Sequence, residues 1–382
     1  MAPTLQRLAE GPGSLLRVAK IDADANRELA KRLGVTGLPT LILFKRGKEV
    51  SRQTAAMSSI ELRAWLGCNG VRPPGNDDAS PSARPVSWGA FYGDAGLRDY
   101  LFGRLHELAL TGGVVMRRFP YWTGESGSAS AAMVRSDDPR VFERITGLPY
   151  SFGCAIEFAG FHKPQDIERL RAAIKPGADL SLVALKLMHA WLSNPGNNWS
   201  KLLDDEAVGA LRMRWIELSS QFLDGQPQDP SAWPDLRTAL SEYPSKDRNV
   251  DHSIQDDFRH MLISVSPPPE PESVDAWVTA LMLGGIGFRG RLRRTGLGWT
   301  RDEMREDDRF ILWLRSRAKL EPGGMFTPDR QEEALAEWKA NQALPGYEQK
   351  LAAELATREA DWDAQSEPLR ERLIWLVEAA SS

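Results

Sequence analysis

The 382-residue chain is poor in cysteine: it has only Cys68 and Cys154. Two cysteines this far apart in sequence exclude a disulfide-rich framework and a cysteine-based metal site. We expect both to be buried or half-buried thiols. The sequence predicts no metal ion, no other cofactor and no catalytic residue.

The chain also lacks long apolar runs and an excess of positive charge. No stretch approaches the roughly 20 apolar residues that a membrane helix needs, and the N-terminus has no basic-then-apolar signal pattern. The net charge of -4 supplies no basic field to hold nucleic acid. These absences predict a cytoplasmic protein that binds neither a membrane nor nucleic acid.

Two motifs resemble ligand sites but have the wrong context. The spacing G-x-G-x-x-G occurs at Gly285, Gly287 and Gly290, but a dinucleotide site needs a strand before it, and a helical pattern precedes it here. We expect a loop or a helix C-cap. The arginines of 289–294 could bind an anion or an acidic partner, although a solvated basic loop facing the acidic run 301–308 is the simpler interpretation.

Composition divides the chain into five parts. Residues 69–85 are rich in Pro, Gly, Ser and Asp, which is typical of a linker, and 265–273 combine a proline run with acidic residues. The boundaries predict an N-terminal domain at 1–68, a middle domain at 86–264 and a helical domain at 274–382.

The N-terminal part has a readable order of elements. Gly34 predicts a helix end, Gly47 a hairpin turn, and Ser58-x-x-Glu61 is a capping box at the start of a helix. Asp24 or Asn26 is expected to cap the second helix. The predicted order is helix 4–9, strand 17–22, helix 26–33, strand 40–44, strand 49–54 and helix 58–66.

This order and the run "RVAKIDADANRELAKRLGVTGLPTLILFKRGKEV" resemble the C-terminal two thirds of thioredoxin. The resemblance covers residues 1–68 and implies an incomplete α/β thioredoxin-like portion. The proline of its G-x-P-T motif is cis in the family, and Pro39 matches it. The resemblance implies that a protein substrate or partner docks on the edge formed by Thr36, Gly37, Leu38, Pro39 and Thr40.

The other half of the family's redox apparatus is missing. Thiol-disulfide exchange needs a thiolate of low pKa, which the family's Cys-x-x-Cys pair supplies, and neither Cys68 nor Cys154 occupies that place. One hypothesis is that the true start lies upstream of Met1, so that the chain is truncated and the product carries the motif. The alternative is that the rest of the chain fills the gap.

The remainder predicts a mostly helical region with one β-α-β unit. Strand 86–92, helix 96–109 and strand 112–119 would form that unit. Residues 142–158 are interpreted as a helix, a Gly-Leu-Pro and a strand, a faint echo of the N-terminal pattern. The segments after His162 have helical spacing, and the 13 tryptophans suit large cores or an interface.

Two functions follow from this sequence. The first is a thioredoxin-family protein-disulfide reductase fused to a helical domain, inactive as printed because its dithiol is absent. The second is a redox-inactive interaction or scaffold protein.

Overall fold

The computed structural model describes most of the chain beyond residue 88 and parts of the segment before it. The described residues are 18–23, 26–35, 40–45, 47–53, 62, 65, 66, 69, 89–117, 120–203, 205–243, 254–318, 333, 336, 337 and 347–381. None of the helices in these ranges is both long and apolar enough to cross a membrane.

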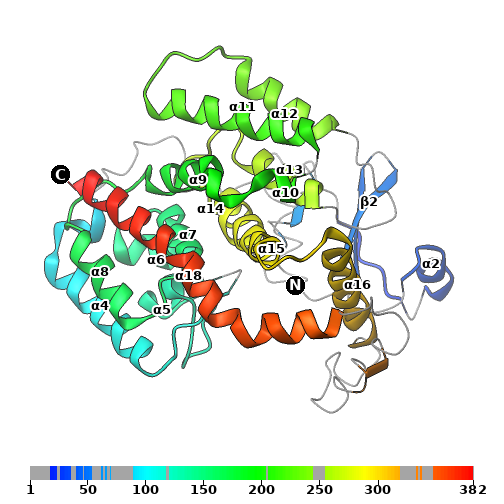
Figure 1. Ribbon diagram of the computed structural model, residues 1–382, viewed down its shortest axis with the longest axis horizontal. Coiled ribbons are helices and arrows are strands. Elements are labelled where there is room, and N and C mark those ends of the chain that lie inside the picture. Colours follow the sequence, from blue (N-terminus) through cyan, green and yellow to red (C-terminus); the bar gives the residue numbers. More distant parts are fainter. Residues whose placement is uncertain are drawn as a thin grey trace.

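The described N-terminal part contains one helix and one hairpin. Helix α2 spans Arg27–Arg32, and strands β1, Leu41–Lys45, and β2, Lys48–Gln53, pair antiparallel. Gly47, at a φ of 76°, makes the turn between the strands. The predicted helix and hairpin are therefore confirmed (Figure 1).

The strand predicted at 17–22 is not observed. The described residues 18–22 have no regular secondary structure, and within the described chain the sheet has only β1 and β2. A strand exists only where its amides and carbonyls meet those of a neighbour. Among the described residues, 18–22 have no such neighbour.

The rest of the described chain is helical. Its first half contains α4 (Ala95–Leu110), α5 (Ala129–Val134), α6 (Pro139–Thr146), α7 (Tyr150–Ala159), α8 (Pro164–Ala173), α9 (Val183–Ser193), α10 (Trp199–Leu202) and α11 (Glu206–Leu223). Its second half contains α12 (Ala232–Glu242), α13 (Ile254–Ser264), α14 (Val274–Trp277), the π-helical η3 (Val278–Gly285), α15 (Ile286–Gly296), α16 (Arg301–Ala318) and α18 (Tyr347–Ser381). Aspartates begin several of these helices as the sequence rules predict; Asp94, for example, accepts hydrogen bonds from the amides of Gly96 and Leu97.

The predicted β-α-β unit is wrong except for its helix. Residues 90–93 form the short turn η1, in which Phe91, Tyr92 and Gly93 all have positive φ, and Val114 makes only an isolated bridge to Gly127. Gly89 and Gly93 permit backbone conformations that a strand cannot contain. Residues 86–88, 118 and 119 lie outside the described ranges.

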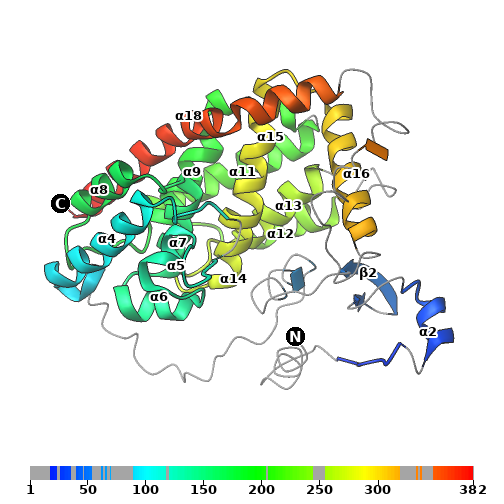
Figure 2. The same cartoon turned by 90° about the horizontal axis from the view of Figure 1, so that it is seen from below.

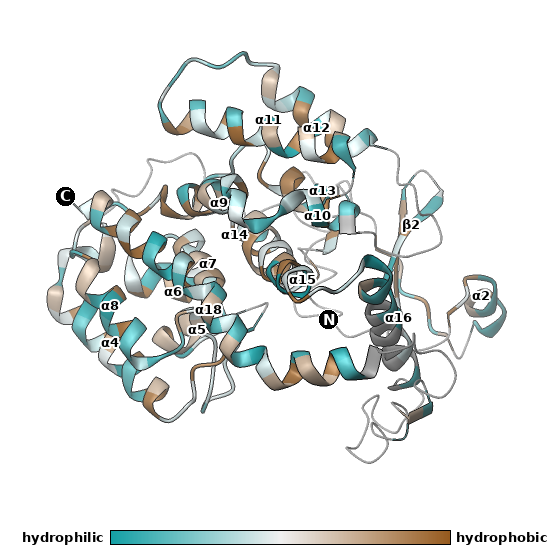
Figure 3. Cartoon of the chain, viewed as in Figure 1, coloured by the Kyte–Doolittle hydropathy of each residue, from teal (hydrophilic) through white to brown (hydrophobic). Residues whose placement is uncertain are grey.

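The strand interpreted within 142–158 is also wrong. Those residues lie in α6 and α7, and all ten residues of α7 are buried. Because α7 is buried on every side, it has no polar face to mark the helical period, and periodicity alone cannot distinguish its sequence from that of a buried strand. In Figure 3 the surface helices α11 and α12 instead carry both polar and apolar residues.

The helices surround one hydrophobic core. A row of rings, each pair 5.0 to 5.6 Å apart, links Phe158, Trp191, Trp199, Phe258 and Phe288 across α7, α9, α10, α13 and α15. The same core contains residues on both sides of 265–273. The described parts of 86–264 and 274–382 therefore share a core, and the domain boundaries stay a prediction.

The G-x-G-x-x-G motif lies inside a helix and not in a loop or C-cap. Gly284 and Gly285 end η3, and Gly287 and Gly290 lie in α15, which continues the same helix. A Cβ on Gly284 would lie 2.6 Å from Cγ of Met261. The glycines here permit close packing of helices and form no phosphate-binding turn.

The long helix α18 covers the other helices along one side. It packs against α7, α8, α9 and α15 (Figures 1 and 2). Both views place β1, β2 and α2 at the opposite end of the molecule from α4 and α8.

Candidate functional site

Most of the predicted docking edge lies outside the described residues. Thr36, Gly37, Leu38 and Pro39 belong to this undescribed stretch, whereas Thr40 is described, is half-buried and directly precedes β1. The docking role and the cis form of Pro39 stay predictions. The structure describes the residues on either side, Val35 and Thr40.

The backbone before the docking edge ends helix α2 in an ordered turn. Gly34 has a φ of 61°, and the amide of Val35 donates to Ala30 O at 2.9 Å. Helix α2 buries none of its residues. Because so short a helix is marginal by itself, it depends on contacts with its surroundings.

Arg52 of β2 supplies such a contact, and the sequence analysis did not identify it. Its guanidinium donates to Gly34 O at 2.9 Å and to Leu33 O at 2.6 Å. It also donates twice to the carboxylate of Glu49, both at 2.8 Å. The hydrogen bond from Arg52 lowers the pKa of Glu49 below its ordinary value, and Glu49 in turn raises the pKa of Arg52.

A sequence signal for this contact exists in the hairpin register. A two-residue turn at Arg46 and Gly47 would bring the end of β2 beside the start of β1, and Arg52 pairs with Ile42 in the observed ladder. A long cationic side chain at this point can reach the carbonyls at the end of a preceding helix.

The hairpin is covered on one side only in the described chain. Leu43 packs with Leu62 and Leu66, and the Trp65 indole donates to Ser51 Oγ at 2.8 Å. On the other side Phe44 is 48% exposed and Val50 is 45% exposed. Exposed apolar side chains on neighbouring strands indicate a face that further chain could cover.

The one described cysteine is unsuited to thiol-disulfide exchange. Cys154 lies within α7 and is fully buried. Burial raises the pKa of its thiol well above the ordinary value, and the nearby carboxylates of Glu157 and Glu143 add to that effect. Exchange requires the opposite, an accessible thiolate of low pKa. Cys68 lies outside the described residues.

We expect Cys154 to resist thiol reagents while the protein is folded. In a Cys68→Ser variant, which leaves Cys154 as the only thiol, Ellman's reagent should release no colour in buffer and one equivalent in guanidinium chloride. The parent chain measured in parallel shows whether Cys68 reacts. Rapid labelling of the folded variant would mean that Cys154 is accessible and would contradict the burial described above.

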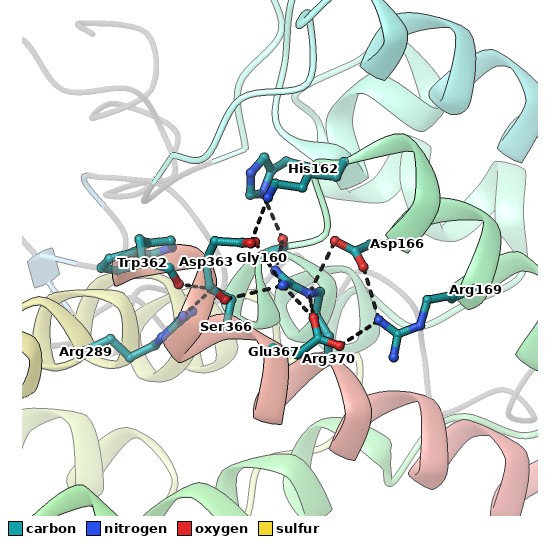
Figure 4. A network of polar contacts seen from close by, with 11 residues as sticks. Gly160, His162, Asp166, Arg169, Arg289, Trp362, Asp363, Ser366, Glu367 and Arg370 are labelled. Atoms are coloured by element: carbon teal, nitrogen blue, oxygen red, sulfur yellow. Dashed lines mark hydrogen bonds and ion pairs between the residues drawn. The ribbon is translucent and has the colours of Figure 1, made fainter. Parts of the chain in front are cut away.

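A polar network joins the end of α7 to α8, α15 and α18 (Figure 4). Its centre is Arg370, which is 2% exposed. Arg370 forms ion pairs with Asp166 at 3.3 Å, Asp363 at 2.9 Å and Glu367 at 2.7 Å. Lys163 adds a pair to Asp363 at 2.7 Å.

Arg289 enters the network from α15 and donates to neutral acceptors. It donates to Phe158 O and, at 2.5 Å, to Ser366 Oγ, and its guanidinium lies 4.5 Å from the ring centre of Trp362. Burial, aided by repulsion from Arg370, lowers the pKa of Arg289 to about 9. A cation beside the last carbonyls of α7 opposes the negative end of that helix.

The other arginines of α15 also contact the protein itself. Arg293 and Arg294 both pair with Glu354 of α18, the latter at 3.0 Å, and Arg291 lies 3.6 Å from Asp257. The predicted solvated basic loop is therefore wrong, because residues 289–294 lie in helix α15 and Arg289 and Arg293 are buried. These ion pairs link α15 to α13 and α18. Arg291, Arg293 and Arg294 thus have carboxylate partners within the protein, and no anionic ligand is needed to balance their charge.

Comparisons with known proteins concern the N-terminal segment. The thioredoxin family model matches residues 1–67. Curated thioredoxins from Rhodospirillum rubrum, Acidithiobacillus ferridurans and Pseudomonas aeruginosa are 37%, 38% and 36% identical over 65, 66 and 69 residues. These matches cover 17%, 17% and 18% of this chain. No solved structure matches the chain.

The chain spans just under two thirds of those relatives, at 62%, 61% and 64% of their lengths. The residues matched by the family model include α2, β1 and β2, the helix and the hairpin that the structure describes. Residues 1–67 are thus a thioredoxin-like segment, and a mostly helical region follows it in the chain.

Proposed function

We propose that residues 1–68 are the substrate-docking portion of a cytoplasmic thioredoxin-type protein-disulfide oxidoreductase fused to a helical region. In this proposal Thr36, Gly37, Leu38, cis-Pro39 and Thr40 form the docking edge, and the Cys-x-x-Cys dithiol lies outside the printed sequence. The observation that carries the proposal is the thioredoxin similarity of residues 1–67, which spans just under two thirds of the matched relatives.

The chemistry would be exchange between two sulfur pairs. A thiolate of the dithiol attacks the substrate disulfide, which forms a mixed disulfide and releases one substrate thiolate. The second cysteine attacks the mixed disulfide, so that the substrate leaves with two thiols and the dithiol is oxidised to a disulfide. The role of residues 36–40 is to hold an extended substrate segment by backbone pairing.

The partly covered hairpin supports this proposal. Phe44 and Val50 are exposed, and so are Ile21, at 47%, and Leu29, at 36%. A complete α/β layer buries such residues. A further segment carrying a strand would cover them and give residues 18–22 a neighbour to pair with.

A second candidate function is a redox-inactive interaction or scaffold module. The observation that favours it is the burial of Cys154, the cysteine that the structure describes. In that case the docking edge would bind an extended peptide without any sulfur chemistry.

The two functions differ in a measurable way. The DNA upstream of the Met1 codon is translated, and the N-terminus of the native protein is sequenced. We expect an in-frame Cys-x-x-Cys shortly before Met1 and a native product that contains it. An in-frame stop, with a native product that begins at Met1, would favour the scaffold.

Insulin reduction with dithiothreitol provides the functional test. The chain as printed is expected to give no turnover above the dithiothreitol background, whereas the extended product is expected to accelerate precipitation of the insulin B chain. The matched control is the extended product with the first cysteine of its pair changed to serine. Turnover by the printed chain would show that the sulfur chemistry has been assigned to the wrong place.

A further inference from the structure

Arg52 contacts described residues on both sides of the stretch 36–39, which itself lies outside the described residues. Its side chain reaches Leu33 O and Gly34 O, just before the stretch. Its backbone pairs with Ile42, just after the stretch. One residue of β2 therefore ties the end of α2 to the start of β1.

The geometry of this tie is rigid for a partly exposed side chain. Two carbonyls and both oxygens of Glu49 accept from one planar guanidinium, which fixes its orientation as well as its position. A lysine at the same place would offer a single charged nitrogen and could not hold these acceptors together. The carbonyls of Leu33 and Gly34 follow the last turn of α2, where a cation is favourable.

We propose that Arg52 is a positioning residue that fixes the end of α2 relative to β1, and so sets the separation of the two backbone ends that carry the docking edge. What docks there rests on the proposed function. The tie itself does not, because each residue that forms it is described.

Hydrogen exchange of the full chain tests the tie without any sulfur chemistry. In Arg52→Met we expect the amides of residues 33–35 to exchange at least about tenfold faster, because charged hydrogen bonds that close this turn are lost. The hairpin amides of β1 and β2 should keep their rates. Arg52→Lys should lie between the methionine variant and the parent.

Lys48→Met is the matched control, since Lys48 is an exposed cation on the same strand. It should leave residues 33–35 unchanged. If the amides of the hairpin and of residues 33–35 exchange faster by the same factor, Arg52 only stabilises β2. If the exchange rates at 33–35 are unchanged, Arg52 does not stabilise the end of α2. Either result overturns the proposal.

A second measurement uses the extended product with its dithiol. There Arg52→Met should raise the KM for insulin severalfold and leave kcat within about twofold, because binding and not sulfur chemistry depends on the edge. A kcat loss at unchanged KM would contradict a positioning role. If the parent extended product is itself inactive, the proposed function fails while the exchange result still decides the role of Arg52.

Discussion

Arg370→Met is expected to lower the free energy of unfolding of the helical region by roughly 3 to 5 kcal/mol, because it leaves the buried carboxylate of Asp166 without its central cation. Asp166 is 5% exposed and, among its ion pairs in the described part of the chain, would keep the one to Arg169 at 3.2 Å, a side chain that is 41% exposed. The substitution also removes the hydrogen bond from Arg370 to Gly160 O. Methionine fills much of the same volume, so the loss is mainly electrostatic.

Urea denaturation followed by tryptophan fluorescence would measure this change. Arg169→Met is the matched control, since it removes a much more exposed arginine of the same network, and it should cost at most about 1 kcal/mol. If Arg370→Met and Arg169→Met cost the same small amount, the buried network contributes no more than a surface pair.

The same network predicts a pH dependence. Burial raises the pKa of Asp363, but the hydrogen bond from Lys163 and the charge of Arg370 outweigh it, so the net shift is downward. Hydrogen bonds from Arg169 and Arg370 lower the pKa of Glu367. A carboxylate whose pKa is lowered in the folded state contributes its full stabilisation at pH values above its ordinary pKa, near 4. That contribution is lost as the pH falls through the lowered pKa. The difference between parent and Arg370→Met should therefore be largest near neutral pH and shrink in acid.

Gly89→Ala is expected to cost roughly 3 kcal/mol or more, because alanine there is both strained and obstructed. Gly89 has a φ of 68° and a ψ of -174°, a region that essentially only glycine occupies. A Cβ at this position would lie 2.1 Å from Gly177 O. The clash would separate two segments that are joined by hydrogen bonds from Ala90 N to Ala178 O and from Gly177 N to Ala90 O.

Gly93→Ala separates strain from obstruction. Gly93 also has a positive φ, of 75°, but a Cβ there would meet nothing within 4 Å. It should cost only about 1 to 2 kcal/mol, the cost of a left-handed conformation for an L-residue. Thermal unfolding of both variants measures the difference, and equal melting temperatures would mean that the approach of Gly177 to Gly89 imposes no cost.

The N-terminal elements could be predicted because their signals are local. The turn at Gly47 and the helix end at Gly34 require conformations that glycine adopts easily, and an apolar strand before the turn and a returning strand after it complete the hairpin. The prediction of a strand at 17–22 was wrong for the opposite reason. Its pairing depends on residues distant from it, and a sequence pattern does not show whether they are present.

The helical region was predicted in type but not in detail. The buried helix α7 has no polar face to reveal its period, and the positive φ angles at Phe91 and Tyr92 carry no sequence signal, since neither residue type favours them. The arginines of α15 were interpreted as exposed because their partners, such as Glu354, lie about 60 positions later.

The candidate site shows the same limit. Family resemblance pointed to residues 36–40, whereas the hydrogen bond from the Arg52 side chain to Gly34 O was found only in the structure. Spacing along the chain places residues within an element. It does not show which side chain closes the gap between two elements.

The position of α18 has a consequence for synthesis of the chain. Lys163 meets Asp363, 200 residues later in sequence, so the surfaces of α7, α8 and α9 that α18 covers are made long before their cover. While the ribosome is still translating, these surfaces remain open to chaperones and to other nascent chains. The layer of α7, α8 and α9 is thus completed only after α18 has also been made.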